Sequence, residues 1–221
     1  MRDLSMVVGA ALSGVAAGVQ SLGPWAGRRQ LFVRFAGEAE TARMYIATAL
    51  VRELARQQSH STFHSIVIGG RDVLGNVPFL FAALSQLTPT IPVMLDTDGQ
   101  RPAELVALLP FLALTQVTVE LGAGDASVDN AMRTVGVAAE AGGPHALVIV
   151  AQSDTPDSQI LRLVQDVHRT SALTQVVLHP FQDAEMPGAL DRRWATVLEL
   201  ATATHGDVRL CLRIPPPTGL R

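Results

Sequence analysis

The chain has 221 residues, of which 48% are hydrophobic and 17% charged, and its formal net charge is −3. This length and hydrophobicity fit one compact core, so we expect residues 1–221 to form a single domain. A faintly acidic chain without clustered Lys and Arg argues against a nucleic-acid partner. The low aromatic content, 5%, also argues against a platform for stacking bases.

The N-terminal stretch 6–19, MVVGAALSGVAAGV, is apolar and rich in small residues. It resembles the hydrophobic part of a secretory signal, but Asp3 lies in what would be its basic part and glycines interrupt the run. We therefore expect a first strand followed by a glycine loop, with a targeting segment as the alternative. No run reaches the roughly 18 uninterrupted apolar residues that a membrane span requires. We expect a cytoplasmic protein with no membrane partner.

Seven short apolar runs recur at nearly regular intervals, and most are β-branched and uninterrupted, as in strands buried on both faces. Helix-like segments lie between them. The first covers 38–57, where apolar side chains recur at helical spacing and two acidic residues occupy the first turn. The expected strands are 30–36, 65–70, 92–97, 116–121, 146–152, 175–180 and 208–214. The other expected helices are 76–87, 101–113, 127–142, 156–170 and 189–204.

Alternation of strand and helix over six or seven units predicts parallel strands joined by right-handed crossovers. A complete eight-unit barrel takes about 250 residues, which is more than this chain has. We therefore predict an α/β fold, specifically a partial (β/α) barrel of about six to seven parallel strands with outer helices. A doubly wound sheet is the alternative.

Charged side chains gather at the ends of the expected strands. In both architectures the carboxyl ends of the strands form the functional face, so we expect a pocket at this mouth. The same residues also fit simpler roles: a turn at Asp98 and Gly99, a structural histidine at His179, or a network in which opposite charges neutralise one another. The candidate binding residues are Arg34, Arg71, Asp96, Asp98, Glu120 and His179.

Metal chemistry has little support in the sequence. Cys211 is the single cysteine, and its apolar surroundings favour a core side chain. One cysteine forms no internal disulfide and holds no iron–sulfur cluster alone. His60 and His64 have the spacing of a helical metal pair, but they fall where a loop meets a strand. We expect no metal site.

Several segments together resemble the radical S-adenosylmethionine enzymes, and among them the 7-carboxy-7-deazaguanine synthases. The most specific is GVQSLGPWAGRRQLFVRFAG (18–37), which follows the order and spacing of the family's SIQGEGP and FVRFaGC segments. IGGRD (68–72) resembles the family's SGGEP, DTDG (96–99) its ETNG, and RIPPPTGLR (213–221) faintly its closing PQxHKLLG. The resemblance covers nearly the whole chain. It implies a homodimer, or pairing with an active relative, and a substrate-carboxylate contact by Arg34.

The departures from that family fall on its catalytic machinery. The three cluster cysteines correspond to Glu38, Ala42 and Tyr45, which as a set cannot replace thiolates on iron. The glutamate that contacts the amino group of S-adenosylmethionine corresponds to Arg71, whose charge repels an ammonium. The family's magnesium contact corresponds to Ala47. The resemblance therefore implies a protein that has lost the cluster, the cofactor and radical chemistry.

The lost cluster loop has a predicted replacement. Without iron, nothing fixes an irregular loop, and EAETARMYIATALVREL (38–54) is a strong helix former. We predict a helix that begins at about residue 38 and fills the space of the cluster. Tyr45 then either packs in the core or projects into the former cluster cavity.

For function, we expect a non-catalytic descendant that binds a small molecule or a partner protein. A pterin- or deazapurine-like carboxylate fits Arg34, whose forked donors suit a carboxylate, with Arg71 as a second cation. The first alternative is a cluster-independent enzyme in which Glu120, Asp96 or His179 acts as general acid or base.

The second alternative is a pure interaction scaffold. It predicts an exposed apolar patch, around Pro24 and Trp25 or around the tail 215–217. An enclosed pocket that holds a carboxylate of raised pKa would favour the enzyme. A mouth filled by side chains would favour the scaffold.

Overall fold

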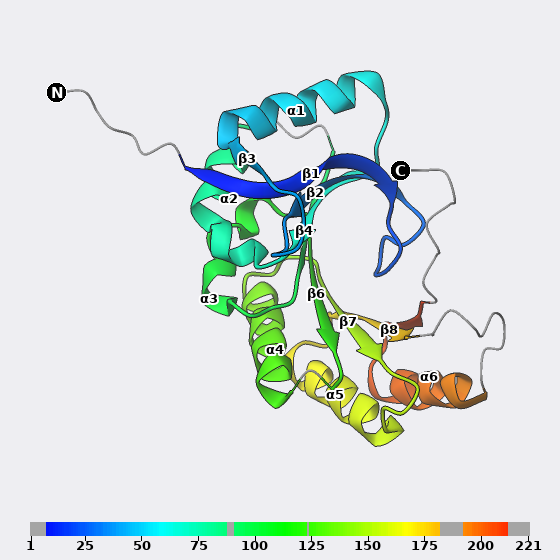
Figure 1. The fold of residues 1–221 in the computed structure, drawn as a ribbon. Coiled ribbons are helices and arrows are strands. Elements are labelled where there is room, and N and C mark those ends of the chain that lie inside the picture. Colours follow the sequence, from blue (N-terminus) through cyan, green and yellow to red (C-terminus); the bar gives the residue numbers. More distant parts are fainter. Residues whose placement is uncertain (1–7, 88–90, 123, 182–191, 212–221) are drawn as a thin grey trace.

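A computed structural model describes residues 8–87, 91–122, 124–181 and 192–211. Strands and helices alternate along most of the chain (Figure 1). The strands are β1 (Gly9–Val19), β2 (Arg29–Phe35), β3 (Arg43–Ile46), β4 (Ser65–Gly70), β5 (Val93–Thr97), β6 (Leu114–Glu120), β7 (His145–Ala151), β8 (Gln175–Pro180) and β9 (Val208–Leu210). The helices are α1 (Ala47–His60), α2 (Val77–Leu84), α3 (Pro102–Leu105), α4 (Asp125–Glu140), α5 (Asp157–Thr170) and α6 (Arg192–Thr204), with short 3-10 turns at Val73–Asn76 and Leu109–Phe111.

The nine strands form one sheet in the order β3-β1-β2-β4-β5-β6-β7-β8-β9. Strands β2 and β4 to β9 are parallel to one another, while β1 runs antiparallel to both β2 and β3. The sheet does not close on itself, because β3 and β9 are its two edges. An α/β fold with a largely parallel sheet is therefore confirmed, and its seven parallel strands are the seven runs predicted from the sequence.

The two faces of the sheet differ because side chains alternate along each strand. One face packs against the helices, which Figure 1 shows on the outer side of the sheet. Leu147 and Ile149, at alternate positions of β7, are both fully buried on this face. The opposite face carries a smaller hydrophobic cluster of Val67, Met94, Leu114 and Ala146, against which Phe32 and Trp25 pack.

The edge strand β3 was not predicted from the sequence. The expected first strand forms as β1. The helix predicted from residue 38 is wrong over its first nine positions: Arg43–Ile46 forms β3, and α1 begins at Ala47. The reason is that β1 offers a free edge, and Gly9 to Leu12 of β1 pair antiparallel with this segment.

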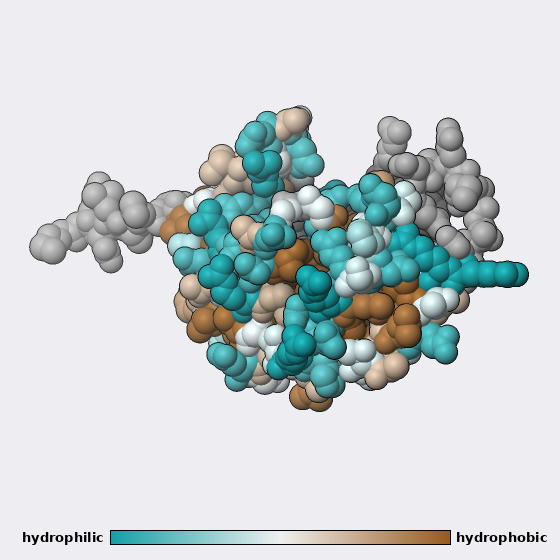
Figure 2. All heavy atoms as spheres, turned by 90° about the horizontal axis from the view of Figure 1, so that it is seen from below, coloured by the Kyte–Doolittle hydropathy of each residue, from teal (hydrophilic) through white to brown (hydrophobic). Residues whose placement is uncertain are grey.

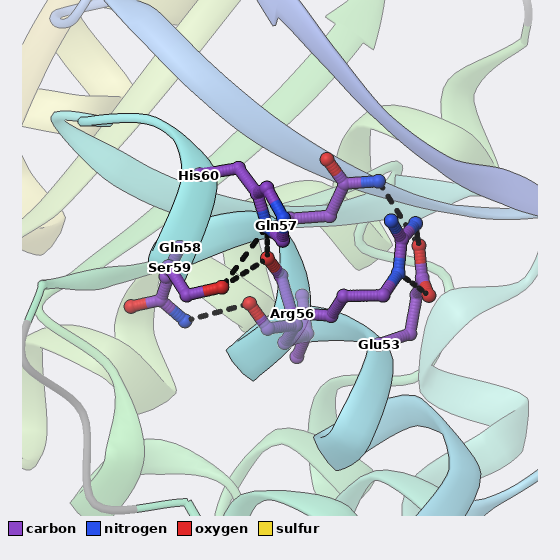
Figure 3. A network of polar contacts seen from close by, with 7 residues as sticks. Glu53, Arg56, Gln57, Gln58, Ser59 and His60 are labelled. Carbon is purple, nitrogen blue, oxygen red and sulfur yellow. Dashed lines mark hydrogen bonds and ion pairs between the residues drawn. The ribbon is translucent and has the colours of Figure 1, made fainter.

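The remainder of α1 follows the predicted stripe, with Leu50 and Leu54 buried against the sheet. Its C-terminal end carries a network of polar contacts within the helix itself (Figure 3). Glu53 accepts hydrogen bonds from Arg56 and Gln57, at 2.6–3.0 Å. The His60 ring closes the last turn at 2.6 Å from the Arg56 carbonyl oxygen. This network stabilises a helix end and lies on the outer surface.

Seen from below, the molecule is mainly hydrophilic, with separate hydrophobic patches between polar side chains (Figure 2). No helix within the described ranges is long and apolar enough to cross a lipid bilayer.

Candidate functional site

A pocket of about 1110 Å³ opens on the sheet face opposite the helices. It lies at the carboxyl ends of β2, β4, β5, β6 and β7, as the parallel topology predicts. The end of β1 and the loop that follows it cover one side of the pocket. The residues that line it come from β1 and its loop (Ala16, Ala17, Val19, Gln20, Ser21, Leu22), from β2 and β4 (Phe32, Val33, Arg34, Val67, Gly69, Gly70), from β5 and its loop (Asp96, Thr97, Asp98, Gln100), and from β6, α4 and β7 (Thr118, Glu120, Ala126, Ser127, Val150).

Arg34 supplies the positive charge of this pocket. It lies one residue before the end of β2, where Phe32 and Arg34 face the pocket and Val33 faces the helix side. Among the described residues no carboxylate forms an ion pair with its guanidinium. Burial raises the pKa of the nearby Asp96 carboxyl, and the charge of Arg34 offsets this in part. Arg34 therefore presents an exposed, forked donor set to anything that enters.

Asp96 lies on the floor of the pocket, at the end of β5. Its Oδ1 accepts two hydrogen bonds, from Gln116 Nε2 and from Thr118 Oγ1, each 3.1 Å long. Burial of the carboxyl raises the pKa of Asp96, although both hydrogen bonds and Arg34 lower it. No described donor bonds to the second oxygen, Oδ2. The floor thus carries a half-buried acid group, with one oxygen held by two hydrogen bonds and the other open to the pocket.

Two further carboxylates stand at the rim. Asp98 follows β5, and its Oδ1 accepts a hydrogen bond from the Gln100 backbone N–H at 3.2 Å. Gly99 has φ +74°, so the predicted turn at this point is confirmed, and Asp98 lines the pocket as well. Glu120 ends β6 and accepts a hydrogen bond from Gln152 Nε2 at 2.8 Å. Both carboxylates are exposed to solvent, unlike the carboxyl of Asp96.

The loop between β1 and β2 folds back over the sheet. Gln20 and the far side of the loop are joined by backbone hydrogen bonds, Gln20 N to Arg28 O at 2.9 Å and Gly27 N to Gln20 O at 2.8 Å. Gly23 at its tip has φ +95°, and a Cβ built there would lie 1.8 Å from Gln116 Oε1. Only glycine lets the loop approach this closely. The loop therefore holds Gln116, which in turn holds Asp96.

The same loop also contacts two residues outside the pocket, Cys211 after β9 and His64 before β4. Burial raises the pKa of the thiol of Cys211, the residue directly after β9, and a backbone hydrogen bond from Gly23 in this loop lowers it in part. Trp25 packs edge-on against the His64 ring, with centroids 4.9 Å apart. The apolar patch predicted around Pro24 and Trp25 is thus not freely exposed, because Trp25 packs on the hydrophobic cluster of the pocket face. The predicted patch at 215–217 lies outside the described residues.

Two predicted pocket residues are not in the pocket. Arg71 donates to Glu38 at 2.8 Å, and both side chains are largely exposed, so Arg71 does not act as a second cation at the mouth. Its strand ends in Gly70, whose φ of +106° turns the chain outward. His179 is buried, and its Nδ1 lies 2.8 Å from the Cys211 carbonyl oxygen. This contact fits the alternative of a structural histidine. The predicted neutralising network of two arginines and two carboxylates does not form.

The three positions that correspond to cluster cysteines do not converge on one point. Glu38 and Ala42 are exposed in the connection before β3. Tyr45 lies in β3 and packs against the hydrophobic core on the helix side, so of its two predicted placements it adopts packing. None of the three lines the pocket.

Gln116 is the residue that the sequence did not single out. It precedes Thr118 and Glu120 at strand spacing in β6, and that row of polar residues inside an otherwise apolar strand is the signal that would have found it. Its side chain is buried, and its Oε1 has no hydrogen-bond partner within the described part of the chain.

Among the described residues, no group of three or more His, Cys, Asp and Glu side chains is placed to hold a metal ion. His60 and His64 have separate partners: the His60 ring contacts the Arg56 carbonyl oxygen at the end of α1, and the His64 ring packs against Trp25.

Comparison with known proteins gives no family. No protein-family model matches the chain, and a search of curated proteins finds no match either.

Proposed function

We propose that this protein binds a small carboxylate-bearing molecule in the pocket, with the Arg34 guanidinium holding the carboxylate. The observation that carries the proposal is a cation on the wall of an open pocket whose described surroundings give it no ion pair. An arginine so placed forms a two-pronged bond with a carboxylate more readily than a surface arginine that already has a partner. The volume, about 1110 Å³, admits a bicyclic heterocycle with room for water.

Within this proposal the ligand is pterin- or deazapurine-like, and the protein is a radical S-adenosylmethionine-like partial barrel without an iron–sulfur cluster. The support is the resemblance of 18–37 to that family, together with the replacement of its three cysteines by Glu38, Ala42 and Tyr45. Arg34 falls inside the most specific matching segment. Self-association, or pairing with an active relative, stays a prediction that sedimentation tests.

The direct test is binding of pterin-6-carboxylate, followed by its intrinsic fluorescence and by thermal shift. We expect binding by the wild type and a loss of about tenfold or more in affinity for Arg34→Gln. Arg71→Gln removes an equal charge from a residue outside the pocket and is the matched control, which should bind as the wild type does. Equal affinity of wild type and Arg34→Gln would refute the proposal.

Loss of the cluster is tested separately. Anaerobic incubation with iron and sulfide should give no stoichiometric absorbance of a four-iron cluster, because the described chain offers no set of thiolates. A stable four-iron signal would contradict the assignment.

A second candidate function is a cluster-independent enzyme. The pocket is open rather than enclosed, but side chains do not fill its mouth, and burial raises the pKa of the Asp96 carboxyl on its floor, which favours an enzyme over a scaffold. Such a group suits general acid catalysis. Turnover of the bound probe by the wild type but not by Asp96→Asn would establish this candidate. Binding without turnover would leave the binding function.

A further inference from the structure

Three adjacent strands place Arg34, Gly69 and Asp96 in one row across the pocket face. Arg34 of β2 pairs in register with Gly69 of β4, and a Cβ built on Gly69 would lie 3.4 Å from the Cβ of Asp96 on β5. All three residues line the pocket. Because adjacent strands are about 4.8 Å apart, the Cα atoms of Arg34 and Asp96 are about 9.5 Å apart, with only a glycine between them.

The space above Gly69 is empty. The three heavy atoms nearest to a Cβ at this position all belong to Asp96, at 3.3, 3.4 and 4.0 Å. No described side chain from β2 or from the β1–β2 loop therefore fills the position. Side chains of neighbouring strands stand roughly perpendicular to the sheet. Arg34 and Asp96 thus form the two walls of a slot that is one side chain wide and opens into the pocket.

The end of the slot nearer the amino ends of the strands is apolar. Two residues earlier on the same three strands, and on the same face, Phe32, Val67 and Met94 are in register with one another. Val67 and Met94 belong to the hydrophobic cluster of the pocket face, and Phe32 packs against it. The slot therefore offers apolar contacts at its inner end and the Arg34 guanidinium at its mouth.

From this geometry we infer that Gly69 determines which ligands the pocket accepts, because its missing side chain leaves a slot for a planar conjugated ring between Arg34 and Asp96. The inference rests on the proposed function and narrows the ligand class to flat ring carboxylates. A planar ring is about 3.5 Å thick, the contact distance between carbon atoms, whereas a puckered saturated ring is thicker. The selection is one of shape and does not depend on the charge of Asp96.

The backbone itself does not require glycine at this position. Gly70 has a positive φ of +106°, but Gly69 does not have a positive φ. An added methyl group would need a shift of only a few tenths of an ångström, at its 3.3 Å contact with the Asp96 carbonyl oxygen. Glycine inside a strand weakens the strand and often marks a place where a ligand approaches closely. The open slot is therefore the feature that glycine provides here.

The first test is Gly69→Ala, which places a methyl group in the slot. We expect the Kd for pterin-6-carboxylate to rise about tenfold or more. Gly37→Ala is the matched control, because Gly37 also has no positive φ, lies outside the pocket, and would place its Cβ no nearer than 3.9 Å to the closest atom. This control should bind as the wild type does. Thermal unfolding without probe checks that both variants are folded.

The second test separates the shape of the slot from a displacement of Asp96, which the added methyl group also touches. Naphthalene-2-carboxylate and decahydronaphthalene-2-carboxylate share a carbon skeleton and a charge, but only the first is planar. In competition with pterin-6-carboxylate, the planar acid should bind the wild type about tenfold more tightly than the puckered one. Gly69→Ala should reduce this preference.

Three results would overturn the inference: a Gly69→Ala variant that binds pterin-6-carboxylate as the wild type does, a wild type that binds the two acids equally or binds neither, or a Gly69→Ala variant that weakens both acids by the same factor. In each case a loss of pterin-6-carboxylate affinity in Arg34→Gln would leave the proposed function standing. A wild type that binds no probe at all refutes the proposed function and this inference together.

Discussion

The two faces of the sheet have opposite chemistry although they share the same strands. On the helix face, side chains such as Val119 and Ile149 are buried in apolar clusters, and the ion pairs lie on the outer surface. On the pocket face, buried amides and an acid group, Gln30, Gln116 and Asp96, lie among few apolar side chains. The helix face buries apolar side chains, and this burial stabilises the fold. The pocket face buries polar side chains, whose burial does not by itself stabilise the fold.

This difference supports the pocket face as the side that carries the candidate site. A buried polar group without a complete set of partners lowers stability unless a ligand uses it. Within the described chain, the Oε1 atoms of Gln30 and Gln116, both on the pocket side of the sheet, lack hydrogen-bond partners, as does Nδ1 of the buried His205 after α6. The predictions that follow contrast the two faces.

The largest expected effect comes from adjacent residues of β7. Ile149→Ala opens a cavity in the helix-side core, where Ile149 is fully buried, and should lower the free energy of unfolding by about 2–5 kcal/mol. Val150→Ala, one residue on, enlarges an existing pocket and should lower it by less than about 1 kcal/mol. Chemical denaturation measures both. Equal losses would show that the pocket face is packed as tightly as the core.

The next effect concerns the loop tip that secures Gln116. Gly23→Ala adds a methyl group that overlaps Gln116 Oε1 at a backbone φ of +95°, and should cost about 2–4 kcal/mol. Gly122→Ala is the matched control: its φ is +104°, but nothing lies within 4 Å of the added carbon. Gly122→Ala should therefore lower the free energy of unfolding by about 1 kcal/mol, through backbone strain alone. A Gly23 variant no less stable than the Gly122 variant would remove the argument that the loop braces the floor of the pocket.

The smallest effect is on the outer surface, in the α1 network of Figure 3. The hydrogen bond from Arg56, followed by that from Gln57, lowers the pKa of Glu53 to about 2. A lowered pKa gives stability that is present above the unfolded value and is lost as pH falls toward about 2. Because the pair is screened by solvent, Glu53→Gln should cost only about 0.2–0.5 kcal/mol at pH 7 and nothing near pH 2. A larger loss would show that surface pairs contribute as much as the buried polar groups.

Sequence reasoning located the sheet well and the site in part. The seven parallel strands are continuous apolar runs, a local signal, and Arg34, Asp96, Asp98 and Glu120 follow from the rule that such strands present their carboxyl ends to a ligand. The start of α1 was wrong because pairing with β1, a contact between distant segments, outweighs local helix propensity.

Contacts that the local sequence does not reveal also explain why other residues were misplaced. Arg71 and His179 also stand near strand ends, but the outward turn at Gly70 and the hydrogen bond to Cys211 take them away from the pocket. Gln116 was overlooked because its role depends on the close approach of Gly23, which lies far from it along the chain. Local pattern gave the strands, while the contacts that select among strand-end residues are tertiary.

The most direct measurement is a crystal structure of the protein with pterin-6-carboxylate. The account predicts the probe in the pocket, with its carboxylate paired with the Arg34 guanidinium. A probe bound elsewhere on the molecule, or seated in the pocket with Arg34 turned away from its carboxylate, would contradict it.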